Sequence, residues 1–481
     1  MEKLLLIIII LSSGVLGLVL YFSSPRRTSE EKKDDLKAIV LGAWIVAAVF
    51  FGPKFAVIRV PGIFDITIER TLFVILVLLL LHNIATSRQR YGGNFSLEVV
   101  MVWFATTCLV SMLLHGFRPR HPDYVSPWFL FISGYLFPFM VFIYAKYVIK
   151  SIRQINIVFT FVFFTGLYLS LIAPLEFYNL REYVYPQYIN EKDVWLHMDR
   201  ARGPFQNAAV NGLVIIYGFL CGTFILSQRK GNWRVIQAVC TFMFLAAVFF
   251  TQTRSIYLSF IVSAFIIVIF YRTRIPKWKA LFLPICMVLI LGIINAPKLA
   301  SEERRKGGVL QIEEVNIRFG LIDRSIAMFM DNPLTGLGFG QFVPASVERY
   351  KGRFEVPSSS FTQTQHNQFL GLAAELGIIG ISLYLLVLGI ILFRVSKVVV
   401  YFYYGDMLIL SNLSITLIAG MLSYLINSMF IEPSYYVAIN ALFYMFCGFV
   451  DNLHENITRG VYLRYQENNN LDLSYAFLSK R

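Results

Sequence analysis

Apolar stretches of about 17 to 25 residues recur from one end of the chain to the other, each long enough to cross a hydrocarbon layer of about 30 Å as a helix. Short polar connections separate most of them. The pattern predicts an all-α, polytopic integral membrane protein with about 12 to 14 transmembrane helices. The predicted spans are residues 3–22, 38–58, 70–87, 96–115, 128–149, 155–174, 206–227, 235–252, 255–271, 279–296, 367–393, 408–430 and 435–453.

The first span has two interpretations, a cleaved signal peptide or a retained anchor. Its apolar stretch continues to Phe22, and the sequence shows no A-x-A-like cleavage site. We therefore expect residues 3–22 to be a retained membrane anchor.

Composition supports the membrane class. Hydrophobic residues make up 57% of the 481 residues and charged residues 15%, whereas about a quarter of a soluble chain is charged. The 16% of aromatic residues suits the belts found at membrane interfaces. All 5 cysteines fall inside predicted spans without metal-site spacing, so we expect them to be small core residues.

The distribution of lysine and arginine predicts the orientation. Alternate short connections such as "SRQR", "QRKGNWR" and "YRTRIPKWK" are basic, which places them and the C-terminal tail on the cytoplasmic side. The outer side then receives the larger segments 116–127, 175–205 and 297–366. We attribute the net charge of +14 mainly to a cytoplasmic rim facing anionic lipid, and it gives no argument for nucleic acid.

Several arginines stand at the outer ends of spans. In "DRARGPFQNAAVNG", Arg200 and Arg202 precede a Gly-Pro break, and Asn207 and Asn211 are spaced to share one helix face. A proline near a helix start would leave the following backbone N–H groups free to meet an anion, and the arginine fork suits phosphate oxygens. In "FFTQTRSIYLSF", Arg254 must meet water, a carboxylate or a bound anion.

The outer cations, which also include Arg118, Arg120 and Arg324, have two interpretations. Each alone fits a solvated loop charge, and together they fit an anion-binding vestibule. His115, beside Arg118 and Arg120, is either part of a rim cluster or a substrate contact.

The last outer segment contains "NIRFGLIDRSIAMFMDNPLTGLGFGQF". Ile317, Leu321 and Met328 recur at helical spacing, which predicts an amphipathic helix over about 316–330 with Arg318 near its start. Residues 331–333 would stop this helix, and the glycines of "GLGFG" permit a tight turn. We therefore expect the segment 297–366 to be partly helical.

The stretch "TQTQHNQFLGLAAELGIIG" places His366 at the mouth of a membrane helix. A histidine there is most often an interfacial or capping residue, and the alternative is a general base. Gln365 and Asn367 are candidates to orient the imidazole or to touch sugar. Glu375 lies about 180° around the helix from His366, so we expect it to be structural and to meet an arginine from another span.

Taken in order, these motifs resemble the O-antigen ligase and polymerase superfamily. The resemblance rests on Arg318, the Pro-Leu-x-Gly-x-Gly turn in "NPLTGLGFGQF", His366-Asn367 and "AELGIIG", and covers roughly residues 200–390. "RARGPFQNAAVNG" and "TQTRS" match two weaker signatures of the same superfamily. The resemblance implies a GT-C-like membrane glycosyltransferase in the bacterial inner (cytoplasmic) membrane, acting on its periplasmic side.

The resemblance also implies a donor and a set of roles. The donor would be an undecaprenyl-diphosphate-linked glycan, transferred to a hydroxyl of a sugar or of lipid A-core. Arg202, Arg318 and Arg254 would bind the diphosphate, and His366 would be the catalytic base. Arg200, Asn207, Asn367, Gln365 and Arg324 are further candidates for binding or orienting substrate. No metal-ligand spacing is evident in the outer segments, so we predict a metal-independent enzyme without a cofactor.

The sequence is compatible with three functions. We favour a polymerase of O-antigen, capsule or exopolysaccharide, because the cationic outer region is large and no feature is dedicated to a lipid-core acceptor. The alternative is an O-antigen ligase that completes lipopolysaccharide. A lipid-linked glycan flippase is the third, and it would predict inverted repeats that the sequence lacks. Membrane lipid and a chain-length regulator are candidate partners.

The predicted spans and motifs divide the chain into three regions. Residues 1–195 would form N-terminal transmembrane helices, and residues 196–453 a catalytic core that includes the periplasmic loop 297–366. Residues 454–481 would form a cytoplasmic tail.

Overall fold

The computed structural model describes residues 29–52, 55, 57–58, 66–86, 95–117, 121, 124–191, 198–229, 233–272, 312–351, 353, 361–405 and 407–461. Eleven of the predicted spans correspond to helices or helix pairs in this part of the chain. These are α2 (Ser29–Phe50), α3 (Ile68–Thr86), α4 (Ser96–His115), α5 (Pro127–Phe131) with the π turn η1 (Ile132–Leu136) and α6 (Phe137–Tyr147), α7 (Ile152–Phe177), α8 (Ala208–Ser227), α9 (Trp233–Phe250), α10 (Arg254–Phe270), α15 (Gln368–Tyr404), α16 (Leu408–Ser428) and α17 (Val437–Thr458). The predicted spans 3–22 and 279–296 lie outside the described residues.

The prediction of an all-α polytopic membrane protein is confirmed. Within the described ranges, 7 helices are long and apolar enough to cross a membrane, with α5, η1 and α6 forming one of them, and α9 and α10 contain shorter apolar stretches. The outer segment adds α13 (Ile312–Asp331) and α14 (Phe342–Arg349), which confirms that it is partly helical. Small elements complete the described chain: the strands β1 (Val57–Ile58) and β2 (Ile66–Thr67), which pair antiparallel, and the 3-10 turns η2 (Arg181–Tyr183), η3 (Gln187–Asn190), η4 (Gly203–Phe205) and η7 (Pro433–Tyr435).

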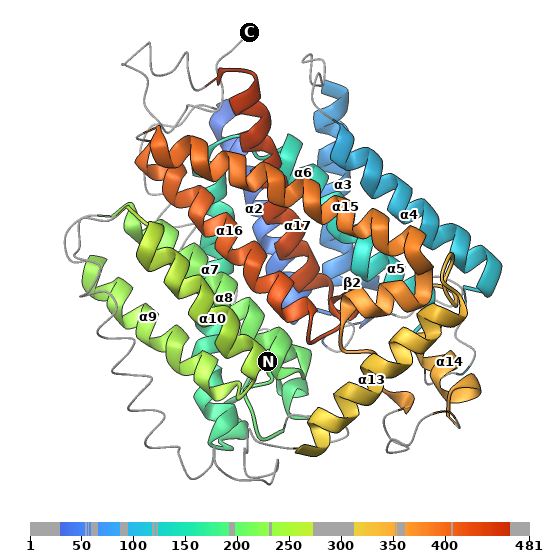
Figure 1. Cartoon of the computed structure of the whole chain (residues 1–481). Coiled ribbons are helices and arrows are strands. Elements are labelled where there is room, and N and C mark those ends of the chain that lie inside the picture. The colour runs from blue at the N-terminus through green and yellow to red at the C-terminus, as the bar shows by residue number, and fades with distance from the viewer. Residues whose placement is uncertain are drawn as a thin grey trace.

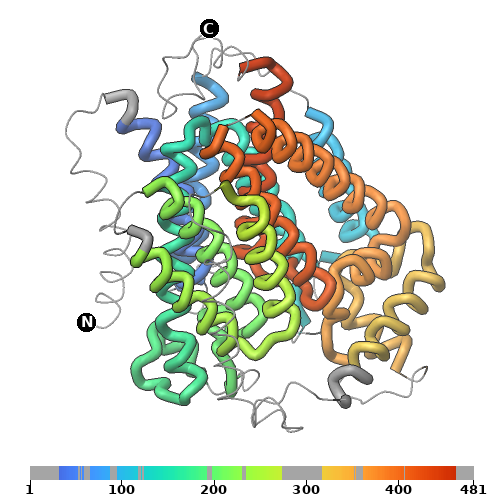
Figure 2. Tube along the Cα trace, turned by 60° about the vertical axis from the view of Figure 1, so that its left-hand side comes forward, coloured from blue at the N-terminus to red at the C-terminus, as the bar shows by residue number. Residues whose placement is uncertain are grey.

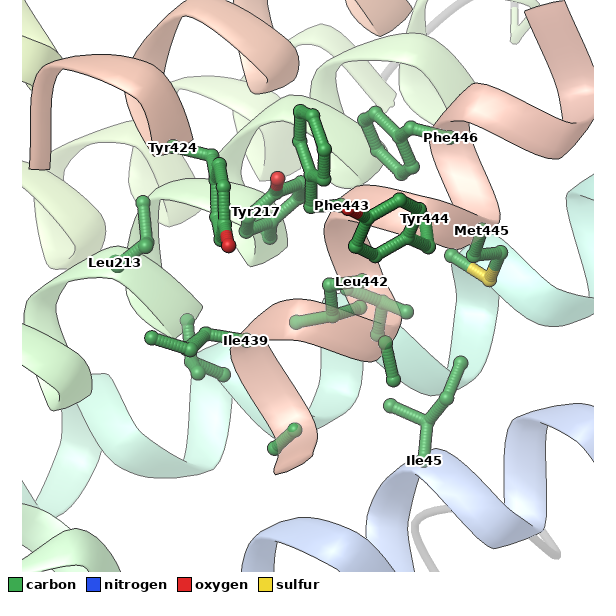
Figure 3. Packing of buried hydrophobic residues seen from close by; sticks show 14 of the residues in the cluster. Ile45, Leu213, Tyr217, Tyr424, Ile439, Leu442, Phe443, Tyr444, Met445 and Phe446 are labelled. Carbon is green, nitrogen blue, oxygen red and sulfur yellow. The ribbon is translucent and has the colours of Figure 1, made fainter. Parts of the chain in front are cut away.

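Burial separates central helices from peripheral ones. In the apolar part of α8, 94% of the residues are buried, compared with 28% in α3. Helix α8 therefore runs through the centre of the bundle, and α3 leaves most of its surface for lipid. Figure 3 shows the interior where α2, α8, α16 and α17 meet: the rings of Tyr424 and Phe443 stack with centroids 4.1 Å apart, and Tyr217 meets Phe446 edge-on at 4.9 Å.

Several helices begin or end together at one end of the bundle. Helices α4, α7, α9 and α16 end there, and α5, α8, α10, α15 and α17 begin there. Figures 1 and 2 both show α13 beside the N-terminal part of α15, at the end opposite the last turns of α17. The charge pattern predicts that this end faces the outer side of the membrane, and we call it the outer end.

The opposite end holds a buried ionic cluster. The ammonium group of Lys146 on α6 contacts Glu98 on α4, and lies 2.9 Å from Asp451 and 2.7 Å from Glu455 on α17. Arg394 on α15 also pairs with Asp451. Because isolated charges are costly at membrane depth, this mutual pairing fastens four helices in one arrangement.

We predict that two cysteine substitutions will report opposite sides of the membrane. Glu182→Cys, an exposed position in the outer loop, should react with a membrane-impermeant maleimide in right-side-out vesicles. Thr458→Cys, exposed at the end of α17, should react only after permeabilisation. The described native cysteines are buried and should contribute little background. The opposite labelling pattern would show that the orientation is inverted.

Candidate active site

Helix α15 is broken at Gly377, close to the start of the helix. Gly377 has φ 62° and ψ −163°, which interrupts the helix nine residues after its start. The interruption leaves backbone groups without hydrogen-bond partners inside the helix. Residues 333–340, which we call the glycine turn, provide the missing partners. The N–H groups of Leu337 and Gly338 donate to the carbonyls of Ala374 and Glu375 at 2.9 and 3.0 Å.

The pairing continues on the other side of the break. The N–H of Ile378 donates to the carbonyl of Pro333 at 2.8 Å, and that of Ile379 to Leu334 at 3.4 Å. The outer segment is therefore joined to the membrane helix through backbone hydrogen bonds on both sides of Gly377. Buried backbone groups must be paired, so this docking compensates for the broken helix.

Glycine is needed on both partners of this contact. The conformation of Gly377 is one that only glycine adopts readily. A Cβ at Gly377 would lie 2.4 Å from the carbonyl carbon of Leu334, and one at Gly336 would lie 2.3 Å from that of Glu375. The close backbone approach explains why the sequence places glycines at these positions.

The side chain of Glu375 also holds the glycine turn. Its carboxylate is buried and accepts a hydrogen bond from the backbone N–H of Phe342 at 3.0 Å. The expectation that Glu375 would meet an arginine was wrong, because its described partner is a backbone amide of the segment leaving the turn. On the adjacent helix α4, Ser111 Oγ accepts a hydrogen bond from the N–H of Phe339, a residue of the glycine turn, at 2.9 Å.

A second residue of α4 also packs against the glycine turn. A Cβ at Gly338 would lie 2.5 Å from the imidazole of His115. His115, one of the rim candidates, is therefore packed against the turn. The predicted partners of His115 in a rim cluster, Arg118 and Arg120, lie outside the described residues.

Two arginine motifs that are distant in sequence come together at the outer end of the bundle. The N–H of Ala201 donates to the carbonyl of Phe250 at 3.0 Å, and the guanidinium of Arg200 to that of Gln252 at 3.4 Å. Residues 199–207, which we call the arginine loop, are thereby fastened to the connection between α9 and α10. Arg254, at the first position of α10, follows directly.

Arg318 on α13 completes an arginine cluster with Arg200 and Arg254. Desolvation by surrounding protein atoms lowers the pKa of Arg318, although its side chain keeps solvent exposure, and the charges of Arg254 and Arg200 lower the pKa further. Arg254 is also exposed, and in the described chain neither it nor Arg318 forms an ion pair. Arg200 is buried, with a carboxylate oxygen of Asp199 3.8 Å from its Nε. Among the described side chains, the carboxylate of Asp199 is the one found near these three cations, and such a cluster can receive an anion with concentrated charge.

Arg202 is oriented differently. Its side chain is fully buried, and one terminal nitrogen donates to the carbonyls of Ile189 and Glu191 at 2.6 and 2.9 Å. Burial lowers its pKa, and the charge of Arg181 adds to this effect. Arg202 thus fastens the arginine loop to η3, and its predicted contact with a diphosphate stays a prediction.

The start of α8 differs from the prediction. Pro204 belongs to the 3-10 turn η4, and α8 begins only at Ala208. Asn207 is its N-cap, and the side-chain Oδ1 of Asn207 accepts from the N–H groups of Ala209 and Val210 at 3.0 and 3.3 Å. The expectation that these amides would be free for an anion was wrong, because the asparagine side chain already pairs with them.

The side-chain amide nitrogen of Asn207 links the arginine loop to the start of α17. Its amide nitrogen donates to the hydroxyl of Tyr436 at 3.1 Å, and Tyr436 directly precedes α17. Asn211, predicted on the same helix face as Asn207, donates instead to the carbonyl of Ala201 at 3.1 Å. Both asparagines therefore fix the arginine loop.

Arg324 lies inside the outer segment. Its guanidinium donates to the hydroxyl of Ser346 at 2.8 Å and lies 4.4 Å from the centroid of the Phe361 ring. Its side chain is fully buried, and burial lowers its pKa to about 10. The side chain joins α13, α14 and the segment that leads to His366, so its contacts are those of a core residue.

His366 occupies an unusual backbone conformation immediately before α15. Its φ is 49°, in the left-handed region that few residues other than glycine adopt. Gln206 in the arginine loop and Gln252 before Arg254 share this feature, with φ of 52° and 47°. Such conformations persist where surrounding structure enforces them, and they concentrate at functional sites.

The neighbours of His366 are engaged in structure. Asn367 caps α15, its side-chain oxygen accepting from the N–H groups of Phe369 and Leu370 at 3.0 and 3.1 Å. Gln365 is buried and donates to the carboxyl group of Glu432, in the connection between α16 and α17. His366 itself is half-buried, between a helix cap and a hydrogen-bonded glutamine.

Glu432 was missed in the sequence analysis. It is buried, accepts from the hydroxyl of Ser434 at 2.7 Å, and lies within electrostatic reach of Glu375. Burial raises its pKa to about 8, and the charge of Glu375 adds to the shift. The one available signal was the acidic residue in "FIEPSYY", a short outer connection between two apolar spans.

Comparison with known protein families identifies one region of the chain. Residues 239–385 match the family model described as O-antigen ligase. Comparison with curated protein sequences gave no match. The matched region contains Arg254, Arg318 and His366, whereas Arg200 and Glu432 lie outside it.

We predict that Gly377→Ala will destabilise the site, while Gly389→Ala on the same helix will not. At Gly377 the new methyl group collides with the glycine turn and the backbone is strained, which costs about 1–3 kcal/mol for the conformation alone. At Gly389 a Cβ meets nothing within 4 Å. Thermal unfolding in detergent should show a lower midpoint for Gly377→Ala only. Equal midpoints would contradict the docking.

Proposed function

We propose that the chain, of which residues 239–385 match the O-antigen ligase family model, is a membrane enzyme of the O-antigen ligase and polymerase superfamily. In the proposed reaction it transfers a glycan from an undecaprenyl-diphosphate carrier to an acceptor hydroxyl. The proposed reaction takes place at the outer end of the bundle, on the periplasmic side of the bacterial inner membrane. The wider boundaries of the catalytic core, residues 196–453, are part of this proposal.

The observation that carries the proposal is the arginine cluster. Arg200, Arg254 and Arg318 come from three separate segments, and their charges are close enough to interact. Like charges repel, and an anion bound between the three arginines would offset that repulsion. A diphosphate leaving group is such an anion, and arginine suits its oxygens better than lysine.

The proposed chemistry divides the roles between the cluster and His366. The acceptor hydroxyl oxygen attacks the anomeric carbon of the donor sugar, and the imidazole of His366 takes the hydroxyl proton. The bond between this carbon and the diphosphate oxygen breaks, and its electron pair leaves with the lipid diphosphate. The arginines stabilise the negative charge that develops on that leaving group.

Arg202 receives a supporting role in this scheme. Its side chain is fully buried, and one terminal nitrogen is engaged by the carbonyls of Ile189 and Glu191. We therefore propose that Arg202 positions the loop that carries Arg200. Asn207 and Arg324 also act through the structure around the site, since their described contacts are with protein groups.

Metal independence stays a prediction. Among the described residues, no group of three or more His, Cys, Asp or Glu side chains could hold a metal ion. The direct check is transfer activity in the presence of a chelator, which should leave the rate unchanged.

Polymerase and ligase share this chemistry, and we favour the polymerase. The two differ in what accumulates in a deletion strain. Loss of a polymerase should leave single repeat units on lipid A-core, whereas loss of a ligase should leave long lipid-linked glycan that is not attached. Electrophoresis of the glycans from such a strain distinguishes the two.

We predict that Arg318→Ala will reduce transfer by about 10²–10³-fold, the usual effect of removing one group that stabilises developing charge. Arg318→Lys should restore little of the activity, because a point charge does not reproduce the bidentate contact. Arg353→Ala is the matched control: it removes another arginine of the outer segment, one that is exposed and paired with Asp331. Full activity in Arg318→Ala would remove this arginine from the mechanism.

We predict that His366→Ala will lower turnover by about 10²–10⁴-fold and leave donor binding intact, because a general base acts in the chemical step. Binding of purified lipid-linked donor and glycan transfer should be measured on the same preparations. Asn367→Ala should weaken the helix start and affect stability more than chemistry. Normal transfer by His366→Ala would refute the mechanism, and loss of donor binding would make His366 a ligand.

A further inference from the structure

The segment that carries His366 is held from one side by a buried acid. The carboxyl group of Glu432 accepts a hydrogen bond from the amide nitrogen of Gln365, the residue directly before His366. Both side chains are buried, with 8% and 6% of their surface exposed. The contact joins positions 67 residues apart, so it is a tertiary contact and not a local turn.

Gln365 is also confined by the start of α15. A Cβ added at Gly371, one turn into α15, would lie 2.0 Å from its amide nitrogen. The glutamine therefore fills the space above Gly371, and its amide nitrogen meets Glu432. Its side chain has little room for another rotamer while these two contacts hold.

The position of Glu432 is fixed in turn by a series of hydrogen bonds. Ser434 Oγ donates to the second carboxyl oxygen at 2.7 Å. The carbonyl of Ser434 accepts from Ser133 Oγ at 2.9 Å, and Ser133 lies in the π turn η1. A Cβ at the adjacent Gly134 would lie 2.8 Å from Cβ of Ser434. The π turn, often found at functional sites, lets this connection approach α5 and α6 closely.

The surroundings of Glu432 favour the neutral form of its carboxyl group. In the described part of the chain no lysine or arginine pairs with it, and the charged group that acts on it is the carboxylate of Glu375. Burial and this neighbour favour its protonated form at neutral pH. A protonated carboxyl offers a carbonyl oxygen to Gln365, which is the function that the geometry requires of it.

We propose that Glu432 is a positioning residue of the transfer reaction, which through Gln365 holds the left-handed backbone of His366 and thereby the direction of its imidazole. This inference rests on the proposed role of His366 as the base. Glu432 itself does not touch the reacting atoms. Its contribution is the alignment of the base with the acceptor hydroxyl, and small misplacements of such groups cost up to about 100-fold in rate.

The proposal makes different predictions for four single substitutions. Glu432→Leu and Gln365→Leu each remove the hydrogen bond, and each should lower turnover by about 10- to 100-fold with donor binding unchanged. Glu432→Gln keeps a carbonyl acceptor and should stay within about threefold of the wild type, as expected for a neutral partner. Gln365→Glu places two carboxyl groups together and should be impaired.

The decisive measurement is the exchange of the two side chains. The double variant Gln365→Glu with Glu432→Gln again pairs an amide with a carboxyl group, in the reverse order. It should recover most of the turnover lost in Gln365→Glu. A second double variant, Gln365→Leu with Glu432→Leu, should be no slower than either single Leu variant, because both changes break the same contact.

A separate variant tests the confinement of Gln365 without altering either partner. Gly371→Ala should displace the glutamine and lower turnover, with Gly389→Ala as the matched control. Donor binding and the unfolding midpoint are measured on every variant, so that a folding defect is recognised. If a Leu variant does not fold, the exchange pair and Gly371→Ala decide the question.

Three results would overturn the inference. Normal turnover in Glu432→Leu or Gln365→Leu would show that the contact is not needed, and a large loss in Glu432→Gln would show that the negative charge matters instead. Failure of the exchanged pair to recover activity would show that the two residues act independently. His366→Ala separates this outcome from failure of the proposed function: if it is inactive while the Leu variants are normal, only the positioning role fails.

Discussion

At Gly377 the helix α15 stops and restarts, and the backbone groups released there pair with the glycine turn of the outer segment. This pairing is the constraint on which the rest of the site depends. It fixes α13, and with it Arg318, relative to the helix that begins just after His366. It also brings the turn against α4, where Ser111 accepts a backbone hydrogen bond. A rigid backbone contact thus connects the proposed anion site with the proposed base.

The remaining contacts divide the polar residues into two groups. Arg202, Asn207 and Asn367 are engaged with backbone groups and hold loops and helix starts. Arg254 and Arg318 keep exposed side chains without an ion pair in the described chain. This division is typical of active sites. Charged side chains keep a fixed direction toward a ligand when the residues that hold their loops and helices are themselves hydrogen-bonded within the protein.

The sequence predicted the features that depend on short-range patterns. Apolar runs located the helices, and the spacing of Ile317, Leu321 and Met328 located α13, whose Leu321 and Met328 are buried. It did not predict the inward direction of Arg202 or the contact of Gln365 with Glu432. These depend on which segments meet in space, and Gln365 and Glu432 are separated by two membrane helices. A buried acid in a short connection carries no periodic signal.

The length of α15 has a consequence for how the substrate arrives. Its 37 residues would extend about 55 Å as a regular helix, well beyond the roughly 30 Å of a hydrocarbon core. This length allows the turns before Gly377 to lie outside the hydrocarbon, which would place His366 at the level of the lipid headgroups. The diphosphate of the proposed carrier lipid would lie at that same depth while the lipid diffuses within the leaflet. In the proposed reaction the donor would therefore reach the site by lateral diffusion, without leaving the membrane.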